Sequence, residues 1–236
     1  FEDMILRLDR DIENLLKSLD ATVGTGNYSL FLTSDHGSVP VASYLADNKL
    51  PAGIANIKQY GVALLSYLNA KYGTNQWIEN FEGESIYLNR DLIKQKKLSL
   101  STVQREVADF MISLDEVTGA LSAADLQTHS YGYGMNQMLQ NGYHSKRSGD
   151  VLLVFKPGYV QNLDPRITMQ RIKGTTHGSG YAYDTHVPML WFGKSIPKGQ
   201  SLRKVSVTDI APSIAQMLNI QYPSGTSGEP LIELFD

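Results

Sequence analysis

The sequence predicts an α/β protein: a layered sheet with helices on both of its faces. Stretches with helical periodicity alternate along the chain with short apolar runs that are bounded by Gly and Pro. Several of these runs are apolar throughout rather than at every second position, which is typical of strands covered on both faces of a sheet. No repeat of 20–50 residues and no low-complexity linker interrupts the pattern.

The chain opens on an amphipathic helix over residues 1–19. Its apolar positions share one helical face, with charged residues opposite: Ile5, Leu8, Ile12, Leu15, Leu16 and Leu19. No initiator Met is present, and no capping residue announces a helix start before the apolar stripe. We therefore expect the chain to enter in or at the edge of this helix, about halfway through a larger protein; the alternative is a processed natural terminus.

The remaining elements follow in order. An apolar run over 28–33 predicts a strand that ends in Ser34-Asp35-His36-Gly37. Further along, the pattern predicts a helix over 54–72 closed by Gly73, a strand over 85–89, a helix over 99–114 capped by Ser99 or Ser101, strands over 150–155 and 187–192, and a helix over 209–218 with Thr208 as its cap and Pro212 in its first turn. We expect 1–236 to form part of one domain, with a smaller α+β lobe inserted over about 78–160.

Composition excludes several classes of protein. With 21 Lys and Arg against 24 Asp and Glu, the net charge of −3 argues against a nucleic-acid partner, which would need a basic face. No apolar run approaches the roughly 20 residues of a membrane span. The chain has no Cys, so disulfide scaffolds, thiol nucleophiles and thiolate metal sites are excluded. Any metal must be bound by carboxylate and imidazole groups.

Asp35 and His36 directly follow the first predicted strand, where ligands bind in open α/β sheets. Adjacent side chains point in different directions in an extended chain, so the pair suits two neighbouring cations, or one cation if the turn folds back. Gly37 permits a tight loop. The alternative, which a bare Asp-His-Gly tripeptide favours, is that Asp35 caps a turn and His36 is an ordinary loop residue.

A second candidate is the loop over 174–186, which holds two of the five histidines. Gly174 and Gly178 lie on either side of His177, so backbone can approach a ligand closely while the imidazole projects into a cleft. His186 precedes Val187-Pro188 and is therefore held extended, which favours a structural role with Asp184 as its partner.

Other polar residues indicate structure rather than chemistry. His129 and His144 have no partner at metal-like spacing, and Arg147 is expected to form a structural ion pair.

Four motifs taken together resemble the C-terminal half of the alkaline phosphatase superfamily. They are Thr33-Ser-Asp-His-Gly37, Lys146-Arg-Ser-Gly-Asp-Val151, the segment from Thr176 to Leu190, and Val207-Thr-Asp-Ile-Ala-Pro-Ser-Ile-Ala215. They stand in the family's order and cover nearly the whole chain. The resemblance is closest to single-chain bacterial phosphatases related to nucleotide pyrophosphatase/phosphodiesterases, and it implies an alkaline-phosphatase-like sheet that is incomplete at its N-terminus.

The resemblance implies a site with two zinc ions. Asp35 and His36 match the pair that holds one ion beside the nucleophilic Ser or Thr, and His177 matches a ligand of the other ion, whereas His186 matches a position that is not a ligand. The resemblance places the family's Asp-x-x-x-His motif shortly before the helix over 1–19, and its nucleophile and phosphate-holding side chains further upstream still. They are expected upstream of residue 1, so no catalytic or substrate-binding residue is assigned.

The function implied for the longer parent is hydrolysis of a small phosphate monoester, in the periplasm or as a secreted enzyme. The chain alone is expected to be inactive and to bind metal incompletely. A nucleotide pyrophosphatase or phosphodiesterase is the first alternative, and the sulfatase branch fits the motifs less well. The second alternative is a noncatalytic binding or assembly domain in which the three residues only stabilise loops. The sequence favours no oligomeric state.

Overall fold

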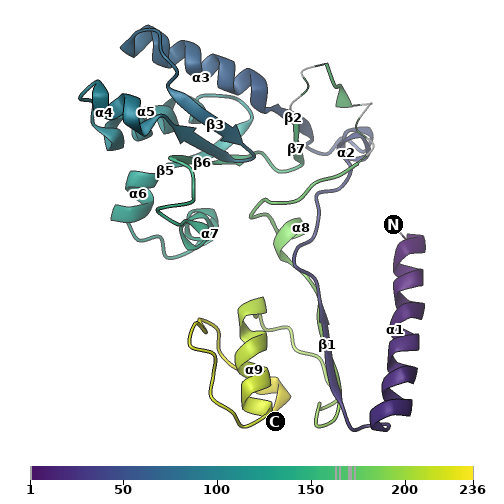
Figure 1. The fold of residues 1–236 in the computed structure, drawn as a ribbon. Helices are drawn as coiled ribbons and strands as arrows, with labels where there is room; N and C mark the ends of the chain where they lie inside the picture. Colours follow the sequence, from purple (N-terminus) through teal and green to yellow (C-terminus); the bar gives the residue numbers. More distant parts are fainter. Residues whose placement is uncertain (1, 163, 165, 170–171, 173, 236) are drawn as a thin grey trace. The chain divides into compact units, whose positions relative to one another are not determined.

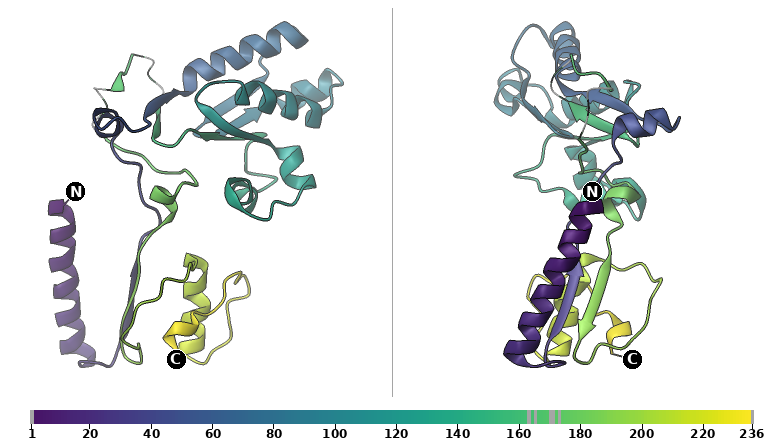
Figure 2. Two further views of the ribbon diagram at one scale, coloured as in Figure 1. Left: turned by 180° about the vertical axis from the view of Figure 1, so that it is seen from behind. Right: turned by 90° about the vertical axis from the view of Figure 1, so that its right-hand side faces the viewer.

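The protein has an α/β fold, as predicted (Figures 1 and 2). The computed structural model describes residues 2–162, 164, 166–169, 172 and 174–235. The elements in chain order are α1 (Glu2–Val23), β1 (Ser29–Thr33), α2 (Ala42–Asp47), β2 (Gly53–Asn56), α3 (Ile57–Tyr72), β3 (Ile78–Glu82), β4 (Ser85–Leu88), α4 (Arg90–Gln95), α5 (Leu100–Ile112), β5 (Val117–Ser122), α6 (Ala123–Thr128), α7 (Gly134–Gly142), β6 (Val151–Phe155), β7 (Tyr159–Asn162), α8 (Ala182–Thr185), β8 (Met189–Gly193), a 3-10 turn (Val207–Asp209), α9 (Ile210–Met217) and a 3-10 turn (Ile232–Leu234). Within the described part of the chain, no helix is both long and apolar enough to cross a membrane.

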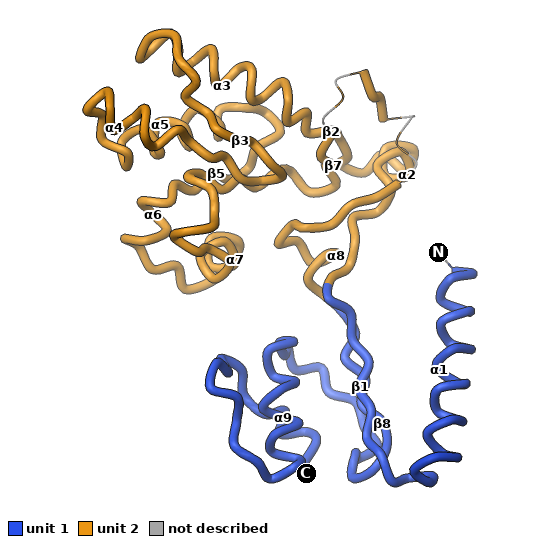
Figure 3. Tube along the Cα trace, in the orientation of Figure 1, with its two compact units in different colours: residues 1–35, 187–236 blue, residues 36–186 orange. Residues whose placement is uncertain are grey.

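The chain divides into two compact units (Figure 3). The first unit combines Phe1–Asp35 with Val187–Asp236, and the second is His36–His186. The boundary therefore falls between Asp35 and His36, inside a predicted site. The lobe that the sequence predicts over 78–160 lies within the numbering of the second unit, and its edges stay a prediction.

In the first unit, β1 and β8 form an antiparallel pair that runs from Ser29↔Gly193 to Thr33↔Met189. Exposed side chains, among them Phe31, Leu190 and Phe192, alternate along this pair with half-buried ones. The apolar composition of these two strands predicts that both of their faces are buried. Among the described residues, no element buries the exposed side chains of this pair. Helix α1 forms as predicted, yet none of its described residues is buried.

The start of α9 differs from the prediction that Thr208 caps it. The Oγ of Ser206 accepts from the backbone N–H of Thr208 at 3.3 Å, and the Asp209 carboxylate accepts from the N–H of Ser206 at 2.8 Å. This capping box precedes the 3-10 turn that leads into the helix. Ser206 is extended, whereas Thr208 already lies within the turn, so Thr208 is the wrong cap.

The second unit is built on a four-stranded antiparallel sheet in the order β3-β4-β6-β5. All five residues of β6 are buried, as a sheet covered on both faces requires. Helix α5 packs on β5 and β6, and α3 contacts β3 (Figure 1). The core between them includes Trp77, Leu64 and Leu153.

Helix α3 begins three residues later than the predicted 54–72. Residues Gly53–Asn56 instead form β2, which pairs in parallel with β7. The side-chain oxygen of Asn56 then accepts from the N–H of Gln59 at 3.1 Å and caps the helix.

A buried carboxylate joins three elements of this unit. Asp150 is 1% exposed, and it accepts from the backbone N–H of Leu88 at 2.8 Å, the Nε2 of Gln104 at 2.7 Å and the Nε of Arg90 at 3.0 Å. Arg90 is thus the ion-pair partner of Asp150. The expectation that Arg147 forms a structural ion pair stays a prediction. Because β4 runs antiparallel to β6, the end of β4 at Leu88 lies beside the start of β6, where Asp150 is found.

Replacement of Asp150 by Ala should lower the free energy of unfolding by about 3–5 kcal/mol, because one buried partner of an ion pair is lost and the Gln104 amide is left unsatisfied. Urea unfolding followed by circular dichroism measures this. Asp109→Ala, at an exposed position on α5, is the matched control and should stay within about 0.5 kcal/mol. Equal effects of the two variants would contradict the structural role given to Asp150.

Candidate metal centre

Two of the three residues predicted as metal ligands lie against each other. The imidazole rings of His36 and His177 are stacked, with centroids 3.5 Å apart and an angle of 18° between their planes. Both belong to the second unit. His36 is half-buried and His177 is exposed, so the stack borders solvent. The structure therefore brings together a loop that follows β1 and the glycine-rich loop that the sequence predicts as the second candidate.

The orientation of the His36 ring follows from one hydrogen bond. Its Nδ1 lies 2.7 Å from the backbone oxygen of Gly37. A carbonyl oxygen only accepts, so Nδ1 carries the hydrogen and Nε2 carries the lone pair of the neutral ring. Metal-binding histidines commonly donate their other ring N–H to a carbonyl in this way.

Backbone hydrogen bonds hold the two loops side by side. The N–H of Val39 donates to the oxygen of Thr176 at 3.1 Å, and the Oγ1 of Thr175 donates to the oxygen of Val39. Directly after His36, the N–H of Gly37 donates to the oxygen of Asp184 at 2.7 Å. A Cβ at Gly37 would lie 2.1 Å from the oxygen of Tyr183, so only glycine permits this approach.

The loop that carries His177 closes on Asp184, which is 4% exposed. The Oδ2 of Asp184 accepts from the backbone N–H of Ser179 at 2.8 Å and from its Oγ at 2.6 Å. Gly178 lies between His177 and Ser179 with φ of 116°, in the region that favours glycine. The predicted pairing of Asp184 with His186 is therefore wrong: His186 is exposed at the end of α8, and the carboxylate faces Ser179.

Two tyrosines attach α8 to the sheet of the second unit. The hydroxyl of Tyr181 donates to the oxygen of Phe155 at 2.8 Å, and that of Tyr183 accepts from the N–H of Gly158 at 3.3 Å. The rings of these two tyrosines lie 5.6 Å apart. The elements that hold His177 thus rest on the buried strand β6.

The third predicted ligand, Asp35, is the last residue of the first unit and is exposed. The Oγ of Ser34 lies 3.4 Å from its Oδ1. Its role beside His36 stays a prediction, because among the described residues no group of three or more His, Asp or Glu side chains is arranged to hold a metal ion. The Nδ1 of His144 accepts from the N–H of Lys146 in its own loop at 3.2 Å. The Nδ1 of His129 lies 3.8 Å from the Oδ1 of Asp125, four residues earlier on α6, so the expectation that His129 has no such partner is wrong.

Glu84 is a residue that sequence reasoning missed. Burial, and then the charge of Asp184, raise the pKa of its carboxyl from 4.5 to about 7, while a hydrogen bond from Gln161 lowers it. The neighbouring Oδ1 of Asp184 is buried and has no hydrogen-bond partner in the part of the chain that the structure describes. A charged residue in a turn between two strands is ordinarily solvated, so the sequence holds no signal for this carboxyl pair.

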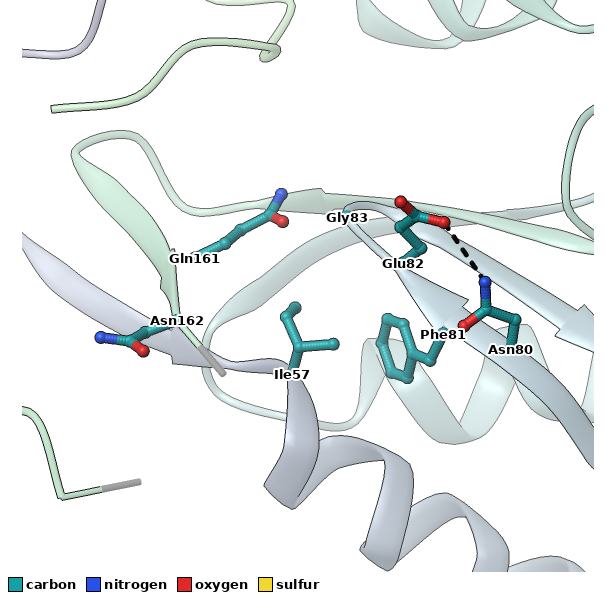
Figure 4. A pocket seen from close by; sticks show the side chains of 7 residues that line it. All are labelled: Ile57, Asn80, Phe81, Glu82, Gly83, Gln161 and Asn162. Carbon is teal, nitrogen blue, oxygen red and sulfur yellow. Dashed lines mark hydrogen bonds between the residues drawn. The ribbon is translucent and has the colours of Figure 1, made fainter. Parts of the chain in front are cut away.

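A groove of about 700 Å³ lies elsewhere in the second unit (Figure 4). Ile57 and Phe81 form its apolar part, Gln161 lies across from them, and the Nδ2 of Asn80 donates to Glu82 at 3.2 Å. The side chains that line it include no His, Lys or Arg. The Glu82 carboxylate is bonded to a neutral amide there, whereas the stacked histidines are two of the predicted ligands and are therefore the better candidate for chemistry.

Comparison with known proteins establishes the family. A family model described as type I phosphodiesterase / nucleotide pyrophosphatase matches residues 1–180. The chain belongs to this family. It is 33% identical over 99% of its length to alkaline phosphatase PafA of Elizabethkingia meningoseptica, and 32% identical over 99% of its length to alkaline phosphatase PhoV of Synechococcus elongatus. The predicted resemblance to the alkaline phosphatase superfamily is confirmed.

The fold is shared with a solved member of the superfamily. The crystal structure of wild-type alkaline phosphatase PafA superposes with a TM-score of 0.87 and 34% identity, covering 98% of this chain and 43% of that chain. The chain spans 41% of the PafA sequence and 40% of the PhoV sequence. The α/β fold class predicted from sequence is therefore confirmed, and the activity of the family is a hydrolase activity as far as its named members show.

Replacement of Gly37 by Ala should destabilise the protein by about 1–3 kcal/mol, because the new methyl group would overlap the oxygen of Tyr183 and force the two loops apart. Thermal and urea unfolding measure the loss. Gly132→Ala is the matched control, since a Cβ there meets nothing within 4 Å. The expectation is contradicted if both variants unfold alike.

We expect the Glu84 carboxyl to make the free energy of unfolding fall as pH rises. Because its pKa is about 7 in the folded chain and near 4.5 when unfolded, its stabilising contribution is fully present below pH 4.5 and is lost as pH rises through 7. The shift corresponds to a loss on the order of 3 kcal/mol. Urea unfolding at pH 5 and pH 8 should show that Glu84→Gln removes this loss and is more stable than the wild type at pH 8. Glu82→Gln, at the end of β3 just before this turn, should retain the wild-type pH dependence.

Proposed function

We propose that this chain supplies one side of a two-zinc phosphate-ester hydrolase, an alkaline-phosphatase-like phosphomonoesterase. Asp35 and His36 would hold one ion and His177 the other. The observation that carries this proposal is the stack of His36 on His177. The reacting Ser or Thr and the remaining ligands would come from outside these 236 residues.

The stack favours two ions over one. An imidazole binds a metal through a lone pair that lies in the plane of its ring. One ion cannot lie in both of two nearly parallel planes whose rings are 3.5 Å apart. Two ions, one in each plane, would allow both rings to act as ligands, as a two-metal hydrolase requires. The geometry of the rings therefore supports a pair of neighbouring sites.

The donor set suits zinc. Imidazole nitrogen and carboxylate oxygen are the ligands available here, since the chain has no Cys. Zinc supplies a hydroxide at neutral pH and stabilises charge that develops on phosphoryl oxygens. The residues of this chain position the ligands: the Nδ1–H of His36 donates to Gly37, so Nε2 would be the ligating atom.

The substrate class has two candidates. The names of PafA and PhoV favour a phosphomonoester, whereas the description of the family model favours a phosphodiester or nucleotide pyrophosphate. Rates on an aryl phosphate and on an aryl phosphodiester, measured on the longer parent protein, decide between them. We also propose a small phosphate ester as substrate and a periplasmic or secreted location, in keeping with the family.

The 236-residue chain alone should bind zinc weakly and hydrolyse nothing. Titration with zinc against a fluorescent indicator should show that His36→Ala and His177→Ala each weaken zinc binding by at least about tenfold. Loss of a residue that only supports a metal ligand already weakens binding by about that much, and loss of the ligand itself should weaken it at least as far. His186→Ala is the control and should bind as the wild type does.

Two outcomes contradict the proposal. If no zinc binds to the chain or to its parent, and His177→Ala melts at the wild-type temperature with and without chelator, the noncatalytic alternative holds. If the isolated chain hydrolyses an aryl phosphate and His36→Ala abolishes this, the assignment of the nucleophile to another segment is wrong.

A further inference from the structure

Asp184 stands between the two loops that carry the stacked histidines. Its backbone oxygen accepts from Gly37, the residue after His36, at 2.7 Å. Its carboxylate accepts twice from Ser179, two residues after His177. A single buried residue therefore contacts both candidate loops through different atoms.

Contacts before and after His177 restrain the position of this residue in its loop. Before the histidine, the oxygen of Thr176 accepts from Val39. After it, Gly178 adopts a conformation that favours glycine and leaves the loop without side-chain restraint at that position. The bonds from Ser179 to Asp184 restrain the chain immediately beyond. His177 is thus held between one backbone contact and one carboxylate.

We propose that Asp184 is a positioning residue, which holds the rings of His36 and His177 in register so that each can bind its own metal ion. The proposal rests on the proposed function as far as the metal is concerned. The register of the rings is a property of the chain without metal, so it can be tested separately.

The hydrogen bonds also indicate which property of Asp184 holds the loop in place. Both bonds from Ser179 go to the same oxygen, Oδ2, whereas Oδ1 has no hydrogen-bond partner among the described residues. An asparagine can place its single carbonyl oxygen where Oδ2 lies and its NH₂ group where Oδ1 lies. An acceptor at one position, rather than the negative charge, is therefore what the loop requires.

The first arm of the test measures the ring stack in the metal-free protein by NMR. Replacement of His36 by Ala removes a ring current from His177, so the Hε1 proton of His177 should change its chemical shift. In an Asp184→Ala background this change should disappear, while in an Asp184→Asn background it should persist. Circular dichroism confirms that each variant is folded.

The second arm measures zinc affinity with zinc alone as the probe. Asp184→Ala should weaken binding by about 10–100-fold, as is typical when the support of a metal ligand is removed. Asp184→Asn should stay within about threefold of the wild type. The zinc affinity of Ser179→Ala should lie between those of the two Asp184 variants, because its backbone N–H still donates. This variant replaces Asp184→Ala in the test if Asp184→Ala does not fold. Glu84→Gln controls for the neighbouring carboxyl and should leave the stack unchanged.

The two arms separate the possible failures. If the stack persists in Asp184→Ala, or if Asp184→Asn loses it to the same extent, the positioning role is overturned whatever the metal does. If the stack behaves as expected but the wild type binds no zinc, the positioning role stands and the two-zinc function fails.

Discussion

The candidate site depends on how closely two segments of backbone approach each other. Residues 37–39 lie against 175–184 through the bonds from Gly37 to Asp184 and from Val39 to Thr176. This approach leaves no room for a side chain at Gly37. The spacing of the imidazoles is consequently set by main-chain contacts, which vary less than those of flexible side chains, and a stack at 3.5 Å needs such a framework.

The framework is in turn attached to the core of the second unit. Tyr181 bonds to the last residue of β6, and β6 is buried along its whole length. Asp150, just before β6, ties that strand to β4 and α5. The buried sheet therefore restrains α8, and α8 in turn restrains the two loops. A functional loop that rests on a packed strand in this way combines exposure with a defined geometry.

Local patterns in the sequence were sufficient where local interactions determine the structure. The apolar run over 150–155 predicts β6, and the periodicity over 99–114 predicts α5 with Ser99 as its cap, because burial and capping involve neighbouring residues. The strand β3 was missed because Glu79, Asn80 and Glu82 are polar, and its pairing with β4 supplies what composition does not. In the site, Asp35, His36 and His177 follow from motifs, while the stacking of the last two is tertiary.

The pairing of Asp184 illustrates why the rest of the site lies beyond sequence reasoning. Nearness along the chain favours His186 as its partner, yet α8 turns the carboxylate toward Ser179 and into the interior. The place of Asp184 near Glu84 carries an electrostatic cost, since burial and then the charge of Asp184 raise the pKa of the Glu84 carboxyl to about 7. The protein tolerates that cost at a residue whose backbone oxygen and carboxylate contact both histidine loops. Such a residue is explained by the position that its two oxygen acceptors, the backbone oxygen and Oδ2, impose on the neighbouring loops rather than by its charge.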